Sequence, residues 1–149
     1  MDWQGDGVWL TTDGERVDLD VVHGFLRDSY WARGVPREVV ERSVRGSIPF
    51  SLHRGERQIG FARVVTDRAT FGYLADVFVV EAERGRGLAR WMIDRVLEHP
   101  DLAGLRRWLL VTRDAHRLYA GVGFTATAAP ERYMEKVRPD PYGARVSTD

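Results

Sequence analysis

The chain has 149 residues, of which 44% are hydrophobic and 30% are charged, and its 22 basic and 22 acidic residues give a formal charge of zero. This composition is that of a globular protein with one core, and the neutral balance argues against broad nucleic-acid binding, which needs a basic face. The absence of cysteine excludes disulfides, thiolate metal ligands and a cysteine nucleophile.

The sequence shows no membrane-spanning or secretory signal. No apolar run approaches the roughly 20 residues that cross a bilayer, and the first residues lack a basic region followed by an apolar stretch. We therefore expect a cytoplasmic protein without a membrane partner. We also expect one domain over residues 1–149, with its core at about 8–137 and a flexible tail at 138–149, where two prolines and a glycine interrupt regular structure.

Apolar periodicity and turn residues predict a mixed sheet covered by helices. In one predicted helix Leu88, Met92 and Val96 form an apolar stripe, with Ala89 and Ile93 beside it. In chain order, the sequence predicts a strand at 8–12, helices at 18–30 and 36–45, strands at 48–53, 58–66 and 70–80, a helix at 88–98, a strand at 107–112, a helix at 114–121, and strands at 123–128 and 133–137.

A turn rich in glycine and arginine joins the strand at 70–80 to the helix that follows, in the stretch ERGRGLARWMIDRVL at 83–97. Gly85 and Gly87 let a backbone approach a phosphate without a side-chain clash. The N-terminus of the next helix offers unpaired N–H groups to an anion, and Arg84, Arg86 and Arg90 can add charge-assisted contacts. The stretch favours phosphate binding; the alternative is a glycine-rich turn with solvated arginines.

Two common phosphate-binding patterns fit this turn poorly. A P-loop ends in Gly-Lys-Ser/Thr, whereas Gly87 is followed by Leu88 and Ala89. A dinucleotide fingerprint needs a third glycine where Arg90 stands, and only about 60 residues follow, too few for the rest of a doubly wound sheet.

Two segments resemble the GNAT superfamily of acetyl-CoA-dependent N-acetyltransferases. The run Arg84-Gly85-Arg86-Gly87-Leu88-Ala89 is similar to its Arg/Gln-x-x-Gly-x-Gly/Ala signature, and Ala115-His116-Arg117-Leu118-Tyr119 with Gly123-Phe124 is similar to its Ala-x-x-Leu-Tyr-x-x-x-Gly-Phe. The resemblance covers residues 8–137. It implies a single GNAT domain with an α/β (α+β) fold, in which about four helices flank a mixed, mostly antiparallel sheet of about six to seven strands that splays between its two central strands.

The resemblance also implies how acetyl-CoA binds. The strand before the turn bonds the pantetheine arm through its backbone, and the turn amides bind the pyrophosphate. Thr112 stands where many members carry a cofactor-contacting asparagine, and Asp114 is expected to cap the short helix after it. The cofactor-binding residues carried over are Val77, Phe78, Val79, Arg84, Gly85, Arg86, Gly87, Leu88, Ala89, Arg90, Thr112 and Tyr119.

The implied chemistry is direct attack of an amine on the thioester. A tyrosine stays protonated at neutral pH and can donate to a departing thiolate, which makes Tyr119 the candidate acid. Asp76, counted on the strand face of Leu74, Phe78 and Val80, is the candidate base or amine anchor. His116, one turn before Tyr119, or a water molecule can also serve as the base. The other histidines share no metal-ligand spacing, and we expect no metal.

The connection between the first two helices is the expected acceptor side. Tyr30 and Trp31, together with Asp76, are the candidate substrate-binding residues; ordinary core packing is the alternative for the two aromatics. The acceptor is a small-molecule or peptide amine that the sequence does not identify. The sequence also leaves open whether the protein forms a homodimer. A module that senses acyl-CoA without turnover is the competing function.

Overall fold

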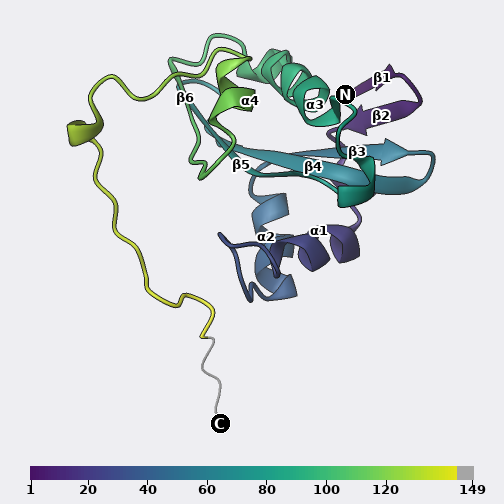
Figure 1. Cartoon of the computed structure of the whole chain (residues 1–149), viewed down its shortest axis with the longest axis horizontal. Coiled ribbons are helices and arrows are strands. Elements are labelled where there is room, and N and C mark those ends of the chain that lie inside the picture. Colours follow the sequence, from purple (N-terminus) through teal and green to yellow (C-terminus); the bar gives the residue numbers. More distant parts are fainter. Residues whose placement is uncertain (144–149) are drawn as a thin grey trace.

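A six-stranded sheet lies at the centre of the protein, with the strands in the order β1-β2-β3-β4-β5-β6. The computed structural model describes residues 1–143. Neighbouring strands are antiparallel except for β5 and β6, which are parallel. Helices α1 and α2 cover one face, and α3 and α4 cover the other (Figure 1). The elements are β1 (Asp2–Gly5), β2 (Val8–Thr11), α1 (Leu19–Leu26), α2 (Arg37–Arg45), β3 (Ile48–Arg54), β4 (Arg57–Thr66), β5 (Phe71–Val79), α3 (Leu88–Leu97), β6 (Arg107–Leu109) and α4 (His116–Ala120).

This architecture confirms the predicted fold class, a mixed and mostly antiparallel sheet flanked by helices. Most of the predicted elements from β2 to α4 are present. The predicted helix at 18–30 ends earlier, at Leu26, and the predicted strand at 107–112 ends at Leu109. No helix among the described residues is long and apolar enough to cross a bilayer.

Strand β1 was not predicted. It forms a hairpin with β2 in which Gly5 is paired with Val8. The two residues between them, Asp6 and Gly7, both have positive φ angles, of 50° and 79°. This is the backbone of a two-residue hairpin turn whose twist matches that of the strands, and Asp-Gly is a preferred sequence for it.

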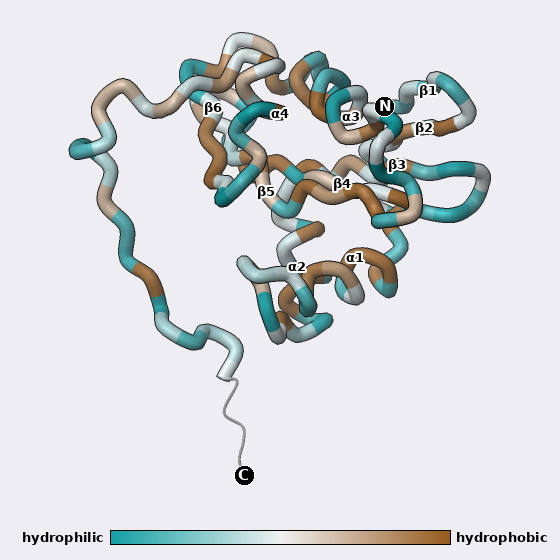
Figure 2. The backbone as a smooth tube through the Cα atoms, in the orientation of Figure 1, coloured by the Kyte–Doolittle hydropathy of each residue, from teal (hydrophilic) through white to brown (hydrophobic). Residues whose placement is uncertain are grey.

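The core has two parts, one on each face of the sheet. On one face α3 buries Leu88, Met92, Ile93 and Val96, which is the predicted stripe. The second part lies under α1 and α2. Strands β4 and β5 and helix α1 are predominantly hydrophobic (Figure 2). Each fully buried aliphatic side chain contributes about 1.5–3 kcal/mol relative to exposure, so the sheet is held from both faces.

A β-bulge interrupts β5 in the middle of the sheet. Phe61 of β4 pairs with Phe78, and Arg63 pairs with Ala75, so β5 carries one more residue than β4 between the two pairs. Asp76, inside the bulge, has a φ of 55°. The extra residue reverses the alternation of faces. Leu74 therefore packs under α3 while Phe78 packs under α1 and α2, and the predicted common face of these two side chains is wrong.

The sheet splays open between β5 and β6. The two strands pair only from Phe71 with Arg107 to Tyr73 with Leu109. β5 then continues to Val79 without a partner on that edge, since β6 has ended. The opening lies beside the edge strand β6 and not, as predicted, between the two central strands, and it leaves main-chain groups of β5 free beside α3 and α4.

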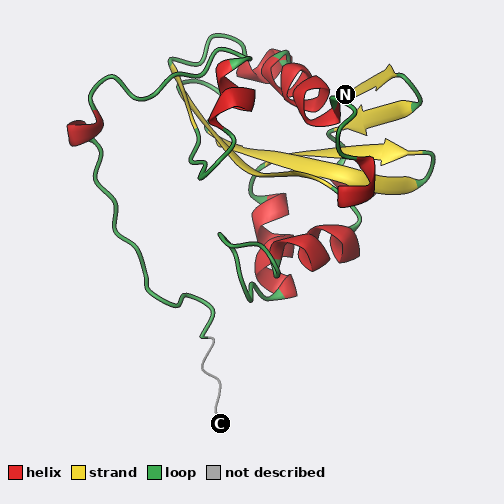
Figure 3. Cartoon of the chain, viewed as in Figure 1, coloured by secondary structure: helices red, strands yellow, loops and turns green. Residues whose placement is uncertain are grey.

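Two predicted strands after α4 are absent. Residues 123–128 and 133–137 form no strand, and a short 3₁₀ turn at Pro130–Arg132 lies between them (Figure 3). Of the predicted flexible tail at 138–149, the part at 144–149 lies outside the described residues. Within the described part, Tyr142 packs against the core under α1 and α2.

Two histidines are buried in neutral form. The backbone N–H of Asp101 donates to His99 Nδ1 over 3.0 Å, so that nitrogen carries no proton. The ring of His53 stacks on Trp9 at 4.1 Å, and its Nε2 lies 3.0 Å from Ser51 Oγ. Burial is the main cause that lowers the pKa of both histidines below 6.5.

These histidines predict a loss of stability at mildly acidic pH. Below about pH 6.5 the unfolded chain binds protons that the buried rings resist, so the free energy of unfolding falls as the pH falls. Thermal melts between about pH 7.5 and 5.5 should show this decline, and His53→Gln with His99→Gln should flatten it. Exposed His116→Gln is the control. An unchanged slope in the double variant would contradict the assignment. Glu83 and Asp67, whose pKa values are also lowered, titrate below this range.

Candidate active site

The turn between β5 and α3 is shaped by two glycines in the left-handed region. Gly85 has a φ of 81° and Gly87 a φ of 75°, a conformation that side chains with a Cβ rarely adopt. No heavy atom lies within 4 Å of where a Cβ would stand at either glycine. α3 begins at Leu88, and no side chain caps it. The first N–H groups of α3 therefore point into open space without a partner from the helix.

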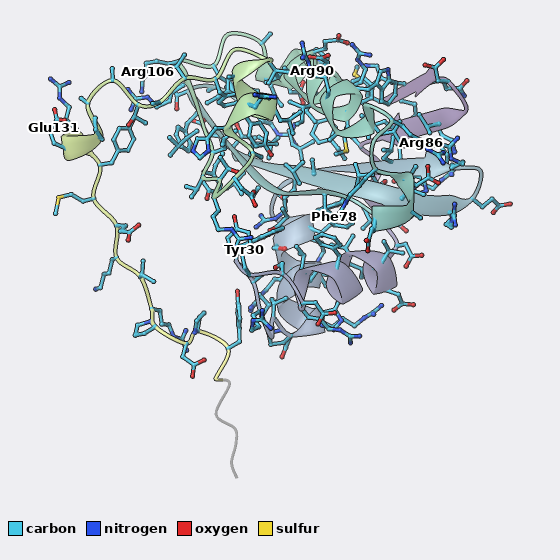
Figure 4. All side chains as sticks on the ribbon, in the orientation of Figure 1. Tyr30, Phe78, Arg86, Arg90, Arg106 and Glu131 are labelled. Carbon is cyan, nitrogen blue, oxygen red and sulfur yellow. The ribbon has the colours of Figure 1, made fainter. Side chains whose placement is uncertain are left out.

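The arginines of the turn already have protein partners. Arg84 Nε donates to the carbonyl oxygen of Val79 over 2.9 Å. Arg86 lies 3.2 Å from Glu83, and Arg90 lies 3.5 Å from Asp94 (Figure 4). The turn thus presents main-chain N–H groups to a ligand, while Arg84 and Arg86 bond to residues before the turn and Arg90 pairs within α3.

Glu83 is the centre of this support. It is only 4% exposed, and its carboxylate pairs with Arg54 at 3.0 Å, Arg57 at 3.2 Å and Arg86 at 3.2 Å. The hydrogen bonds from Arg54 are the main cause that lowers the pKa of Glu83. Arg54 and Arg57 therefore attach the turn to the β3–β4 hairpin, and Arg86 pairs with Glu83 within the turn.

The last residues of β5 lie along the splayed edge. The N–H of Val80 donates to Ile59 in β4, so the N–H of Val79, one residue earlier, points to the opposite edge. Val77 belongs to the bulged part of the strand and also lines a cavity on the acceptor side. The side chain of Phe78 is buried and stacks on Phe25 at 4.0 Å, so this residue can offer a ligand only its backbone.

Tyr119 lines two cavities of the described chain. Its side chain is 9% exposed and packs edge-on against Phe124 at 5.9 Å. It lines a cavity of about 950 Å³ beside β6 and another of about 450 Å³ beside α1 and α2. Its hydroxyl has no hydrogen-bond partner among residues 1–143. Burial and, to a smaller extent, the neighbouring Tyr30 raise the pKa of Tyr119 to about 12.

α4 and the first turn of α3 are neighbours. A Cβ added at Gly121, directly after α4, would meet an Arg90 guanidinium nitrogen at 2.9 Å. Glycine at this position lets the two elements approach closely. Tyr119 and the glycine turn therefore lie on the same side of the sheet, where Leu88 and Tyr119 share one core.

Asp76 lies in the smaller cavity with Trp31. Trp31 Nε1 donates to Asp76 Oδ1 over 2.8 Å, and Arg63 Nε donates to Asp76 Oδ2 over 2.7 Å. Both carboxylate oxygens thus accept one hydrogen bond from the protein. Tyr73 also lines this cavity. The structure therefore brings the two predicted substrate-side residues, Asp76 and Trp31, into direct contact.

Tyr30 ties the loop after α1 to the segment after β6. Its hydroxyl accepts a hydrogen bond from the N–H of Arg113 over 3.2 Å, and the Arg113 guanidinium lies 3.8 Å from the centre of its ring. Tyr30 and Trp31 meet edge to face at 5.1 Å. Both are partly exposed and line the cavity, so neither is an ordinary core residue.

The residues before α4 differ from the prediction. Thr112 Oγ1 accepts a hydrogen bond from the N–H of Ala115 over 3.0 Å, whereas Asp114 is exposed and caps nothing. The predicted cap at Asp114 is wrong because the helix begins one residue later, at His116. The Thr112 hydroxyl proton remains available to a ligand. His116 is exposed at the wall of the larger cavity.

Arg63 and Tyr142 are site residues that the sequence did not single out. Arg63 interrupts an otherwise apolar strand, and a charged residue in a central strand is a signal of a buried pair. Tyr142 lines the smaller cavity from the segment after the last regular element. Its long sequence separation from α1 and α2 left no local signal.

Comparisons with known proteins agree with this geometry. A profile of the acetyltransferase (GNAT) family matches residues 20–124. One solved structure is that of a Xanthomonas campestris pv. campestris protein described as a candidate acetyltransferase of the GNAT family. Its sequence is 43% identical to this chain, with a TM-score of 0.89, and the match covers 93% of this chain and 98% of that one. A Gibberella zeae protein named as a candidate acetyltransferase is 29% identical over 80% of this chain and 79% of its own length.

A more distant structure adds information on the fold. A protein from Clostridium acetobutylicum described as a predicted acetyltransferase, in a structure with acetyl-CoA, is 15% identical with a TM-score of 0.64, covering 92% of this chain and 96% of that one. Since the family profile spans most of the chain, the protein belongs to the acetyltransferase (GNAT) family. Acetyl-CoA is the acyl donor used by this family.

Proposed function

We propose that the protein is an acetyl-CoA-dependent N-acetyltransferase in which an amine attacks the thioester directly. The observation that carries the proposal is the joint position of three features at the splayed edge of β5. These are the open glycine turn at the start of α3, the unpaired main chain of β5, and the free hydroxyl of Tyr119.

The turn fits a diphosphate by its shape. The N–H groups at the start of α3 are free, and the positive end of the helix dipole favours an anion. Cβ positions at Gly85 and Gly87 are unobstructed, so a ligand can approach the backbone itself. The free N–H of Val79 and the bulged main chain around Val77 would hold the amide groups of the pantetheine arm, and Thr112 would add one donor.

Tyr119 supplies the acid. With its pKa at about 12, the phenol stays protonated through the physiological range. Its hydroxyl is unengaged and faces a cavity, so it can donate a hydrogen bond to the sulfur as negative charge develops there. The same shift makes the phenol a weak acid. Complete proton transfer would therefore follow, and not precede, the breaking of the carbon–sulfur bond.

Asp76 binds the amine. The remaining lone pairs of the carboxylate can accept N–H groups of the substrate while the 2.7 Å ion pair with Arg63 stays in place. Trp31 fixes the carboxylate from the other side. The proton of the ammonium then leaves to water in the cavity or to exposed His116.

Asp76→Asn should therefore raise the KM for the amine by about tenfold, the effect of losing one charged hydrogen bond, with a smaller change in kcat. Steady-state kinetics at saturating acetyl-CoA measure the two separately. Glu41→Gln is the matched control, because Glu41 is an ion-paired carboxylate exposed on α2. A large fall in kcat at unchanged KM would instead make Asp76 the base.

Thiol release tests the proposed function. The protein is mixed with acetyl-CoA and a panel of amines, and free thiol is detected with a colorimetric reagent. Because the chain has no cysteine, the protein itself contributes no signal. Thiol release that depends on an amine is expected. Binding of acetyl-CoA without turnover on any amine would instead indicate an acyl-CoA sensor.

A further inference from the structure

Arg63 brings a positive charge into the cavity on the acceptor side. It lines the cavity of about 450 Å³ beside α1 and α2, and its side chain is 18% exposed. Its Nε donates to Asp76 Oδ2 over 2.7 Å, but its two terminal nitrogens make no hydrogen bond among residues 1–143. Each terminal nitrogen carries two donors. A mostly buried cation therefore has free N–H groups, and a carboxylate is the group that pairs best with them.

The fold places this cation beside the carboxylate of Asp76. Ala62 and Val64 pack on the face under α3, so Arg63 between them points to the opposite face, which α1 and α2 cover (Figure 1). Arg63 pairs with Ala75, and the bulge at the next residue turns Asp76 into the same cavity. The two opposite charges thus lie side by side on neighbouring strands.

The charges of the cavity match a zwitterion. Among the described residues that line it, the only other charged side chain is Asp114, which is exposed and lies 3.6 Å from Arg113. An ammonium group can bind the free lone pairs of Asp76 while a carboxylate binds Arg63. An α-amino acid carries these two groups on one carbon atom, so its charges are adjacent as well. A polyamine or an aminoglycoside would instead bring further positive charge against Arg63.

The rest of the wall is apolar and aromatic. Trp31 and Tyr30 line the cavity and are 44% and 46% exposed, and Trp31 is held in place by its hydrogen bond to Asp76. Tyr73 and Tyr142 also line it. Aromatic rings stack favourably on such walls, and the cavity lies within the range of about 300–1,000 Å³ that is usual for small-molecule sites. The cavity therefore favours a ligand with a large apolar group.

We propose that the acceptor is a free α-amino acid with an aromatic or large apolar side chain, whose carboxylate binds Arg63 and whose amine binds Asp76. This inference rests on the proposed acetyl transfer. Tyr119 lines the same cavity, so the bound amine lies on the side of the candidate acid. The N-terminus of a peptide carries an amide where the amino acid carries its carboxylate, and it would lose the charge-assisted bonds to Arg63.

The reaction then yields an N-acetyl amino acid and coenzyme A. The amine nitrogen forms a bond to the carbonyl carbon of the thioester, and the carbon–sulfur bond breaks. The substrate ammonium loses two protons in all. One balances the proton that the departing sulfur receives, and the other leaves to water.

Matched acceptors test the carboxylate. L-Phenylalanine, L-phenylalanine amide and 2-phenylethylamine share the ring and the amine, but only the first has a carboxylate. At saturating acetyl-CoA, kcat/KM from thiol release should be about tenfold or more higher for L-phenylalanine than for the other two, the effect of a hydrogen bond between charged groups. L-Alanine, which has the carboxylate but no large side chain, should also be a poorer acceptor than L-phenylalanine.

Variants of Arg63 test the assignment to this residue. Arg63→Gln should bring the ratio of kcat/KM between L-phenylalanine and 2-phenylethylamine close to one, whereas Arg63→Lys, which keeps the charge, should retain part of it. Arg63 also holds Asp76, but a displaced Asp76 lowers the rate with both acceptors and leaves the ratio unchanged. Arg45→Gln is the matched control, because Arg45 is an ion-paired arginine exposed on α2.

Calorimetry with the same acceptors, in the presence of coenzyme A, separates this inference from the proposed function. Thiol release without a preference for L-phenylalanine would overturn the inference and leave acetyl transfer standing. If no amine releases thiol, acetyl transfer fails. Tighter binding of L-phenylalanine than of 2-phenylethylamine, lost in Arg63→Gln, would then still support the amino-acid site, and equal or absent binding would overturn it.

Discussion

Replacing Gly87 by glutamate should weaken coenzyme A binding by about 100-fold or more, since it sets a negative charge against the diphosphate and disturbs several main-chain donors. Gly87 has a φ of 75° and directly precedes α3. A Cβ there is strained in this backbone, and its carboxylate would occupy the open space that the turn offers to an anion. Isothermal titration calorimetry with coenzyme A measures the effect.

Two control variants separate charge from shape. Gly14→Glu adds the same charge at a distant glycine where a Cβ also meets no atom, and it should bind normally. Gly87→Asn is neutral, and asparagine tolerates the left-handed region better than most residues, so it should lose much less affinity. Tight binding by a folded Gly87→Glu protein would mean that the diphosphate lies elsewhere.

Tyr119→Phe should lower kcat by about 100-fold or more, the usual contribution of a positioned acid or base, while the Kd for acetyl-CoA stays the same. The substitution removes a hydroxyl with no partner among residues 1–143, so the fold should not change. The ring keeps its place against Phe124. Kinetics and calorimetry on the same preparation separate catalysis from binding.

The pH dependence of the wild type gives a second check on Tyr119. Because its pKa lies at about 12, ionisation of this phenol should cause no loss of rate up to about pH 10. Full activity of Tyr119→Phe would remove this residue from the mechanism.

The parts of the fold that follow local patterns could be predicted from the sequence. The stripe of Leu88, Met92 and Val96 fixes the buried face of α3, because a helix repeats its faces at a regular interval. The glycine pair at 85 and 87 indicated the turn, since only glycine adopts its backbone freely. The β1–β2 hairpin was predictable as well: Asp6-Gly7 is a known turn signal, but it was not recognised.

The bulge at Asp76 was not predictable in this way. A strand pattern assumes that side chains alternate strictly between the two faces of the sheet. One extra residue moves every later side chain of the strand to the opposite face. Aspartate tolerates positive φ better than most residues, but many aspartates in strands do not adopt it. The ion pair with Arg63 and the bond from Trp31 are contacts between distant segments, so no local window contains them.

The strand predicted at residues 133–137, after α4, is absent for a different reason. Residues 133–137 have the side chains of a strand but no neighbouring strand within the described chain. A strand exists only where another strand accepts its hydrogen bonds, and sequence alone does not say which chain provides that partner.

Glu83 links the β3–β4 hairpin to the turn that we propose binds the coenzyme. Its carboxylate joins Arg54 and Arg57, which flank the hairpin loop, to Arg86 inside the turn. One buried carboxylate thus connects the hairpin loop to the backbone proposed to bind the diphosphate. We therefore expect a contact made at the distant hairpin tip to change the affinity for coenzyme A, although the tip lies far from the reacting atoms.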